Sequence, residues 1–213
     1  MDIGSLRKEY TSIGIEENEL ATDPFDQFSH WFKQAQEAGI DEPNAMSLAT
    51  VETNGQPGLR TVLLKHFDAN GYVFYTNYES QKAQDLDQNP QATLLFPWVS
   101  LQRQVIIKGL AHRISAAQSA QYFLSRPRES RIGAWVSPQS KVIESRKILD
   151  MQWEKMKQRF KDGEVPRPDH WGGYCVSPHS IEFWQGRESR LHDRFLYKWN
   201  PDQEQWRLQR LAP

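Results

Sequence analysis

Apolar positions follow helical spacing in some parts of this chain and strand spacing in others. Asp23 is a good N-cap, Pro24 suits a first helical position, and Gly39 can end the helix between them. Apolar residues recur at helical spacing on one face of this segment, namely Phe25, Phe28, Phe32 and Ala35. The pattern therefore predicts an amphipathic helix soon after residue 20.

Runs of β-type residues, separated by turn signals such as Asn54-Gly55 and Asn70-Gly71, predict strands through the middle and end of the chain. The predicted strands cover residues 45–52, 59–67, 72–76, 92–99, 103–114, 173–176, 181–185, 194–199 and 205–211. Helical patterns occupy 80–88 and, with breaks near Pro127 and Pro138, 115–160. Many short antiparallel strands with inserted helices predict a β-barrel-like α+β domain. Because no Gly-rich strand-to-helix fingerprint is present, a Rossmann dinucleotide site is not expected.

Residues 1–20 are polar and weakly patterned, which predicts an arm or lid. The remaining residues, 21–213, are expected to form a single domain, since 213 residues lie within single-domain size. A formal charge of −1 gives no basic field for nucleic acid or an anionic membrane. The single cysteine, Cys175, excludes an internal disulfide framework, and neither a transmembrane run nor a signal-peptide core is visible. These features predict a soluble cytoplasmic protein.

The stretch from Phe183 to Phe195 is unusually rich in aromatic and cationic side chains. If its second half is extended, Arg190, His192 and Arg194 project from one face. Such a group favours a bound anion or an electron-rich ring, and the aromatic flanks favour a planar, phosphorylated ligand. The alternative is a solvated strand end with scattered charge.

Two further segments carry cations where a phosphate could bind. Arg60 and Lys65 end an apolar strand on opposite faces, so one ligand could receive both only through a bend; alternatively they simply mark the strand ends. Ser80-Gln81-Lys82 begins a helix, where free N–H groups, a hydroxyl and a lysine suit a phosphate. Ordinary N-capping explains Ser80 equally well, but it does not explain the lysine.

Tyr122, Arg126 and Ser130 recur every four residues on one helical face, across a break at Pro127. A phenol, a guanidinium and a hydroxyl suit a second phosphate, although a polar solvent face would look the same. Gln139-Ser140 adds small polar donors. No histidines have metal-ligand spacing backed by carboxylates or cysteines, and no nucleophile motif is present, so neither a metal site nor a triad is predicted. The sequence thus predicts a phosphorylated cofactor beside a phosphorylated substrate.

Taken together, these motifs closely resemble the pyridoxamine 5′-phosphate oxidase family. The resemblance runs in order from Arg7 to the terminal Arg210-Leu211-Ala212-Pro213 and includes residues 60–65, 75–76, 103–105, 122–130, 133–140 and 183–194. It implies an FMN-binding split β-barrel, antiparallel and Greek-key-like with surrounding helices, and a homodimer with two flavins at the subunit interface. It also implies oxidation of pyridoxine and pyridoxamine 5′-phosphate to pyridoxal 5′-phosphate, with dioxygen reduced to hydrogen peroxide.

The resemblance implies a role for each matching position. The cofactor-binding positions are Arg60, Thr61, Val62, Leu63, Leu64, Lys65, Tyr75, Thr76, Gln81, Lys82, Gln104, Gln139, Ser140, Trp184 and Arg194. The substrate-binding positions are Arg7, Lys8, Glu9 and Tyr10 in the closing arm, Lys65, Tyr122, Arg126 and Ser130 at the substrate phosphate, and Arg190, Leu191 and His192 at the ring. Arg190 and His192 are the catalytic candidates, and no general base is assigned.

One position departs from the family pattern. Gln81 stands where the family usually has arginine, which predicts weaker FMN binding unless another cation such as Arg187 compensates. Two other functions remain open. One is a split-barrel flavin oxidase acting on another planar ring, such as a phenazine precursor, and the other is a non-catalytic flavin or pyridoxal-phosphate carrier. The intact substrate-phosphate set of Lys65, Tyr122, Arg126 and Ser130 disfavours the first, and a turnover assay would exclude the second.

Overall fold

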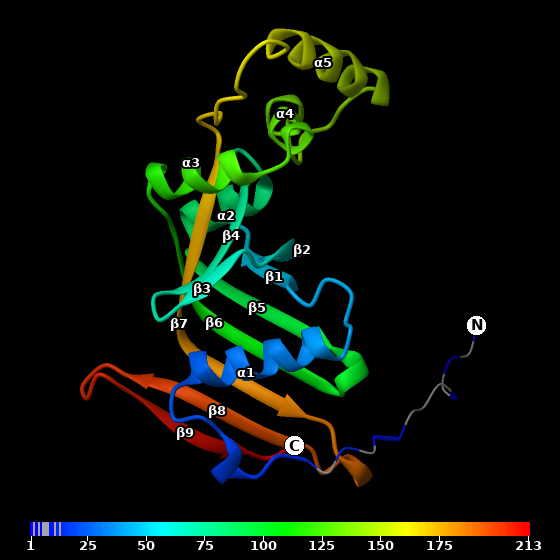
Figure 1. Cartoon of the computed structure of the whole chain (residues 1–213). Coiled ribbons are helices and arrows are strands. Elements are labelled where there is room, and N and C mark those ends of the chain that lie inside the picture. Colours follow the sequence, from blue (N-terminus) through cyan, green and yellow to red (C-terminus); the bar gives the residue numbers. More distant parts are fainter. Residues whose placement is uncertain (2, 4, 6–8, 11, 13) are drawn as a thin grey trace.

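The computed structural model describes residues 1, 3, 5, 9–10, 12 and 14–213. Its helices are α1 (Pro24–Glu37), α2 (Gln81–Gln88), α3 (Ala116–Ser125), α4 (Arg128–Val136) and α5 (Arg146–Arg159), with short 3-10 turns η1 (Glu17–Glu19), η2 (Val99–Leu101) and η3 (Glu188–Arg190). Its strands are β1 (Ala45–Val51), β2 (Pro57–Leu63), β3 (His66–Asp68), β4 (Gly71–Asn77), β5 (Gln91–Trp98), β6 (Arg103–Arg113), β7 (Trp171–Gln185), β8 (Asp193–Asn200) and β9 (Gln205–Leu211). Helices α3 to α5 lie at one end of the molecule, and β8 and β9 lie at the other (Figure 1).

All strand pairs are antiparallel and form one nine-stranded sheet. The main path runs β2-β1-β5-β6-β7-β4-β3, and β8 joins β7 and carries β9. Helix α1 crosses the sheet near β5 and β6 (Figure 1). The predicted antiparallel α+β architecture is therefore confirmed.

Strand β7 is the spine of the sheet. Its first part pairs with β4 and its last part with β8, while β6 follows its other edge for most of its length. The prediction of two separate strands at 173–176 and 181–185 was wrong, because the polar residues between them continue the pairing with β6 through a register shift at Lys108/Gly109. One strand therefore connects the two ends of the molecule (Figure 1).

The predicted strand at 59–67 is also corrected. The chain pairs with β1 up to Leu63 and then changes partner, since the Leu64 N–H donates to Asn44 O and the Lys65 N–H donates to Val73 O. Leu64 turns into the core and is 4% exposed. The strand thus becomes β2 and β3, with a bend between them that strand periodicity alone does not reveal.

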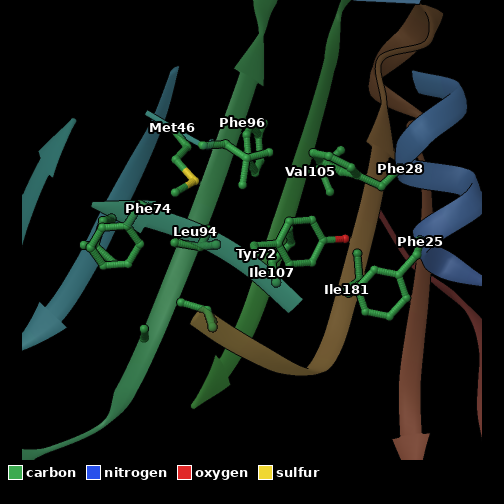
Figure 2. Packing of buried hydrophobic residues seen from close by; sticks show 14 of the residues in the cluster. Phe25, Phe28, Met46, Tyr72, Phe74, Leu94, Phe96, Val105, Ile107 and Ile181 are labelled. Carbon is green, nitrogen blue, oxygen red and sulfur yellow. The ribbon is translucent and has the colours of Figure 1, made fainter. Parts of the chain in front are cut away.

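Helix α1 follows its sequence signals. The Asp23 side chain accepts a hydrogen bond from the Phe25 N–H at 2.7 Å, and Gly39 takes a φ of +69° just past the helix end. Figure 2 shows Phe25 and Phe28 pointing from α1 into the hydrophobic core. Phe28 lies edge-on to Tyr72 of β4 and to Phe96 of β5, with ring centroids 5.0 Å apart in both pairs. The apolar face of α1 thereby packs against the sheet as part of the hydrophobic core.

The segment before β8 is not extended, contrary to the prediction that Arg190, His192 and Arg194 share one strand face. Ser189 and Arg190 have positive φ angles of 57° and 63°, and β8 begins only at Asp193. The segment therefore does not form the continuous strand that would put the three side chains on one face.

Among the residues that the structure describes, no helix is long and apolar enough to cross a membrane.

Candidate functional site

A cavity of about 830 Å³ lies where β2 and β4 meet α2, α3 and α4. Its walls combine cations with aromatic and small residues: Arg60, Thr61, Val62, Leu63, Lys65, Tyr75, Thr76, Asn77, Lys82, Tyr122, Arg126, Pro127, Ser130, Gly133, Ala134, Ser137, Gln139 and Trp171. The cavity thus brings together Arg60, Lys65, Lys82 and Arg126, which the sequence predicted as binding positions for phosphorylated ligands.

One wall of the cavity is the α2 cradle, which we define as Arg60, Thr76, Ser80, Lys82 and Gln139. The Lys82 ammonium donates to Thr76 Oγ1 at 3.3 Å, Ser80 Oγ at 3.3 Å and Gln139 Oε1 at 3.2 Å. Burial lowers the pKa of Lys82, repulsion from Arg60 lowers it further, and Asp85 opposes both effects. Among the described residues the three hydrogen-bond acceptors of this ammonium are neutral oxygens, so its charge is available to an anion.

Ser80 precedes α2 but does not cap it. Its side chain makes no capping hydrogen bond and instead accepts from the Lys82 ammonium. The N-capping alternative is therefore wrong for this side chain. The first backbone N–H groups of α2 lie at the end of the helix that carries Lys82, where they favour a bound negative charge.

Arg60 and Lys65 both line the cavity, although strand periodicity places them on opposite faces. The bend at Leu64–Lys65 provides the explanation that the sequence left open. Two residues outside the cavity lining position the Arg60 guanidinium. Its Nη1 donates to Thr50 Oγ1 at 2.6 Å, and its Nη2 lies 3.6 Å from Asp85 Oδ2. Burial lowers the pKa of Arg60, and the carboxylates of Asp85 and Glu52 counteract it.

The opposite wall is the α3–α4 socket, defined as Lys65, Tyr122, Arg126 and Ser130. The Arg126 guanidinium lies 4.7 Å from the Trp171 ring centroid, and within the described part of the chain its Nη1 is buried without a hydrogen-bond partner. Burial lowers the pKa of Arg126. An unpaired buried guanidinium nitrogen is costly, so this wall is built to receive an acceptor from a ligand.

Aromatic rings stack behind the socket. Tyr75 and Tyr122 lie with centroids 3.9 Å apart, and Tyr75 and Trp171 lie 5.2 Å apart, both nearly parallel. Burial raises the pKa of Tyr75 to about 12, so its hydroxyl keeps its proton at neutral pH. The stack fixes the Tyr122 ring relative to β4, and the two phenols enter the cavity as neutral groups.

Some predicted positions lie outside this cavity. Leu64 belongs to the core, Ser140 is exposed with a φ of 70°, and Gln81 is exposed and donates to Asp85 Oδ1 at 2.8 Å. Arg187, suggested as a substitute for the missing family arginine, instead lies 3.4 Å from Asp193 Oδ2. Within one chain it does not reach the α2 cradle.

The other predicted ring and flavin positions form a second group at the far end of the sheet, comprising Gln104, Trp184, Arg190, Leu191, His192 and Arg194. Gln104 faces Trp184 across the β6–β7 ladder. Trp171 lines the cavity, and it is separated from Trp184 by nearly the whole of β7. At about 3.3 Å per residue this separation is roughly 40 Å along the strand. A single chain therefore does not bring the two groups together.

His192 lies at the centre of this far group. Its ring is 4.7 Å from the Trp184 ring and 5.6 Å from the Tyr10 ring, between centroids. The backbone N–H of Arg187 donates to His192 Nδ1 at 3.1 Å. Because Nδ1 accepts this bond, the neutral ring carries its proton on Nε2 and can donate it to a ligand.

The neighbours of His192 have different surroundings. Arg190 is exposed, whereas Arg194 donates to Glu182 Oε1 at 2.8 Å and to Ala212 O at 2.9 Å. In the arm, Tyr10 contacts Trp184 and Glu9 is exposed, while Arg7 and Lys8 lie outside the described residues.

Three further residues, none of them predicted from the sequence, shape these sites. Trp171 forms the platform under Arg126, Asp85 holds Arg60, and Asp193 accepts from the Ile15 N–H and from Arg187 and Arg210. Asp85 stands one helical turn after Gln81, and this spacing is the one signal that the sequence offered. No helical or strand spacing links Trp171 or Asp193 to its partners, so the sequence alone does not predict these contacts.

Within the ranges that the structure describes, no group of three or more His, Cys, Asp or Glu side chains could hold a metal ion.

Comparison with known proteins covers nearly the whole chain. The family model described as pyridoxamine 5′-phosphate oxidase matches residues 32–160, and the one described as pyridoxine 5′-phosphate oxidase C-terminal dimerisation region matches residues 171–213. Proteins named pyridoxine/pyridoxamine 5′-phosphate oxidase are similar over full length. That of Crocosphaera subtropica is 55% identical and that of Dichelobacter nodosus is 54% identical, each over 100% of both chains.

Solved structures agree with the fold. PhzG from Burkholderia lata, in complex with tetrahydrophenazine-1-carboxylic acid, has a TM-score of 0.89 at 25% identity, over 95% of this chain and 99% of its own. A pyridoxamine 5′-phosphate oxidase-related, FMN-binding protein from Nostoc punctiforme has a TM-score of 0.72 at 19% identity, over 91% of this chain and 100% of its own. The predicted split-barrel fold is confirmed.

Proposed function

The chain belongs to the pyridoxamine 5′-phosphate oxidase family, and we propose that it oxidises pyridoxine 5′-phosphate and pyridoxamine 5′-phosphate to pyridoxal 5′-phosphate, with FMN as cofactor and dioxygen as electron acceptor. The observation that carries the proposal is the pair of cationic walls in one cavity. Lys82 offers a buried charge that meets only neutral hydrogen-bond acceptors, and Arg126 offers a buried Nη1 without a partner among the described residues, which suits two phosphorylated ligands in one cavity.

The α2 cradle fits the phosphate of FMN. Its buried ammonium bonds neutral oxygens, and a phosphate would add the missing negative charge. In this assignment Arg60 and Lys82 neutralise the phosphate, and Thr76 and Gln139 hold the adjoining ribityl chain. Gln104, Trp184 and Arg194 flank the flavin rings.

The α3–α4 socket fits the phosphate of the substrate. Arg126 would donate through its unpartnered Nη1, while Tyr122, Ser130 and Lys65 supply the remaining donors. Gripping the phosphate away from the reacting carbon fixes the pyridine ring in one orientation. Because both sockets open into one cavity, the two ligands would lie against each other.

Bound FMN would supply the redox chemistry, accepting a hydride from the exocyclic carbon of the substrate and passing the electrons to dioxygen. The residues of the chain would bind the two ligands, orient them and shield them from water. Arg190 and His192 would lie over the substrate ring, and the Nε2–H of His192 would donate a hydrogen bond to it. No side chain of the described region is assigned as a general base.

The site requires a second copy of the chain. The cavity and the His192 group are separated by most of β7, and one small ligand cannot span that length. A two-fold homodimer would bring the far end of one subunit to the cavity of the other, and two-fold dimers are the commonest assemblies. The match of residues 171–213 to a dimerisation region supports this arrangement.

Residues 1–20 would act as an arm on the single domain formed by 21–213. The Ile15 N–H donates to the buried carboxylate of Asp193 at 3.0 Å, and Tyr10 packs beside His192 and Trp184. This anchoring would place the arm over the substrate ring and exclude water. A cytoplasmic location is part of the proposal, in keeping with a free, buried Cys175.

One other function has a specific observation behind it, namely oxidation of a phenazine precursor, because PhzG shares the fold closely. The complete α3–α4 socket and the more similar relatives favour the phosphorylated substrates instead. The decisive experiment supplies purified protein with FMN, air and either pyridoxine 5′-phosphate or the unphosphorylated pyridoxine, and follows pyridoxal 5′-phosphate absorbance and peroxide. Turnover restricted to the phosphorylated compound is expected, and absence of turnover with both would refute the proposal.

A further inference from the structure

A buried carboxylate stands behind the α2 cradle, where a phosphate site would be expected to hold only donors. Asp85 is 3% exposed. Its Oδ2 accepts from Thr50 Oγ1 at 2.6 Å and lies 3.6 Å from Arg60 Nη2, and its Oδ1 accepts from Gln81 Nε2 at 2.8 Å. No family role assigned to Gln81 accounts for this arrangement.

Asp85 acts on both cations of the cradle. Its charge raises the pKa of Arg60 against the effect of burial, and it does the same for Lys82. Arg60 and Lys82 repel each other at the same time, which lowers the pKa of the lysine. The carboxylate therefore partly neutralises a pair of cations that would otherwise lie buried and close together.

The contact with Arg60 is shared rather than direct. Thr50 Oγ1 accepts from Arg60 Nη1 at 2.6 Å and donates to Asp85, so the hydroxyl links the two charged groups. The 3.6 Å separation of Arg60 and Asp85 is longer than a charge-assisted hydrogen bond. An arriving phosphate can therefore take over the guanidinium without breaking a short ion pair.

We propose that Asp85 is an internal counter-ion of the cofactor phosphate site, which stabilises the empty cradle and thereby limits its affinity for FMN. The inference rests on the proposed function, since it takes the α2 cradle as the FMN phosphate site. Without Asp85, the empty cradle would carry two unneutralised buried cations, and the phosphate would relieve both. Asp85 is a positioning and charge-setting residue that acts through Arg60.

The contact between Gln81 and Asp85 also determines how an arginine at position 81 would affect FMN binding. An arginine at this position lies one helical turn before Asp85, at the spacing of an intrahelical ion pair. It would give the carboxylate an alternative partner and release Arg60 toward the phosphate. An arginine introduced at position 81 of this chain would thus strengthen FMN binding through Asp85.

The test measures the dissociation constants of FMN and riboflavin by quenching of flavin fluorescence on the full-length apoprotein. Asp85→Asn keeps the shape and removes the charge. We expect it to tighten FMN binding about tenfold, on the scale of one charged contact. Riboflavin, which lacks the phosphate, should bind with unchanged affinity. A gain in affinity is informative because structural damage would weaken binding.

Asp87→Asn is the matched control. It removes the same charge from the same helix and breaks the contact of Asp87 with Arg113, 2.6 Å away, which lies outside the cradle. It should leave FMN affinity unchanged. Equal tightening by both variants would show a general charge effect and overturn the proposal.

Gln81→Arg is a second variant whose folding does not depend on Asp85→Asn, because residue 81 is exposed at the helix start, and no gain in FMN affinity from Gln81→Arg alone would overturn the proposal. It should tighten FMN about fivefold in the natural background and less than about twofold beside Asp85→Asn. Equal gains in both backgrounds would indicate direct contact with the phosphate and refute the counter-ion role. If the natural protein binds riboflavin and FMN equally or binds neither, the proposed function fails; if it prefers FMN and Asp85→Asn does not tighten it, only the counter-ion proposal fails.

Discussion

Mixing two inactive variants should restore activity if each site uses the cavity of one subunit and the far end of β7 of the other. Arg126→Ala removes a donor from the cavity, and Arg190→Ala removes a group from the far end. In a mixed dimer one site carries both changes and the other carries neither. The unchanged site should then work normally.

The size of the loss makes the restoration measurable. Arg126 has a buried, unpartnered Nη1 and lies against Trp171, so its replacement removes a charged phosphate contact from a partly desolvated place. Such a contact contributes about 1.5–3 kcal/mol, which corresponds to a loss of roughly ten- to a hundredfold in kcat/KM. Each homodimer should therefore retain only a few per cent of the natural activity at low substrate concentration.

Random exchange of subunits gives mixed dimers as about half of the population, each with one unchanged site, so about a quarter of the natural activity should return. The two variants are unfolded together, refolded with FMN and assayed for pyridoxal 5′-phosphate formation below the KM of the natural enzyme. Refolding each variant alone is the control. The reasoning is refuted if the mixture shows only the average of the two homodimers, because both groups would then act within one subunit.

Three further outcomes distinguish the roles at the far end of the sheet and in the cavity. Arg190→Ala should lower kcat while FMN affinity stays within about twofold, whereas Arg194→Ala should weaken FMN by about tenfold; similar flavin loss in both variants, measured by fluorescence titration, would contradict the separate roles. His192→Gln, whose amide can donate near the Nε2 position, should keep at least about tenfold more kcat than His192→Asn, which preserves only the Nδ1 side; the reverse order would mean that Nε2–H is not the working donor. Arg126→Ala alone should raise the KM for pyridoxine 5′-phosphate about tenfold or more with FMN affinity nearly constant. Comparable losses in FMN affinity and in substrate use would mean that the two phosphate sockets are misassigned.

Local sequence determined most of the secondary structure. Helix α1 begins at Asp23–Pro24 and ends before Gly39 because its capping chemistry lies within a few residues. Strand β9 coincides with the predicted 205–211 for the same reason, since alternation is visible along the segment itself. The spacing of Tyr122, Arg126 and Ser130 likewise predicted a shared face, and all three line the cavity.

Motifs that were each ambiguous alone identified the family when they were taken in order. The sequence therefore predicted the antiparallel fold, the cationic cavity and the chemistry of phosphorylated ligands.

The tertiary structure decided what depends on partners distant along the chain. The bend at Leu64–Lys65 exists because the strand changes its pairing from β1 to β4, and this exchange puts Arg60 and Lys65 into one cavity. The positive φ angles of Ser189 and Arg190 exclude the extended conformation in which Arg190, His192 and Arg194 would share one face, although neither residue is a glycine.

The role of Asp85 and the need for a second subunit also depend on residues that are distant along the chain. Asp85 meets Thr50 and Arg60 only when β1, β2 and α2 pack together. The separation of the cavity from His192 follows from the unbroken length of β7. Sequence periodicity reports which face a residue takes on its own element, whereas pairing and packing between elements determine which residues meet.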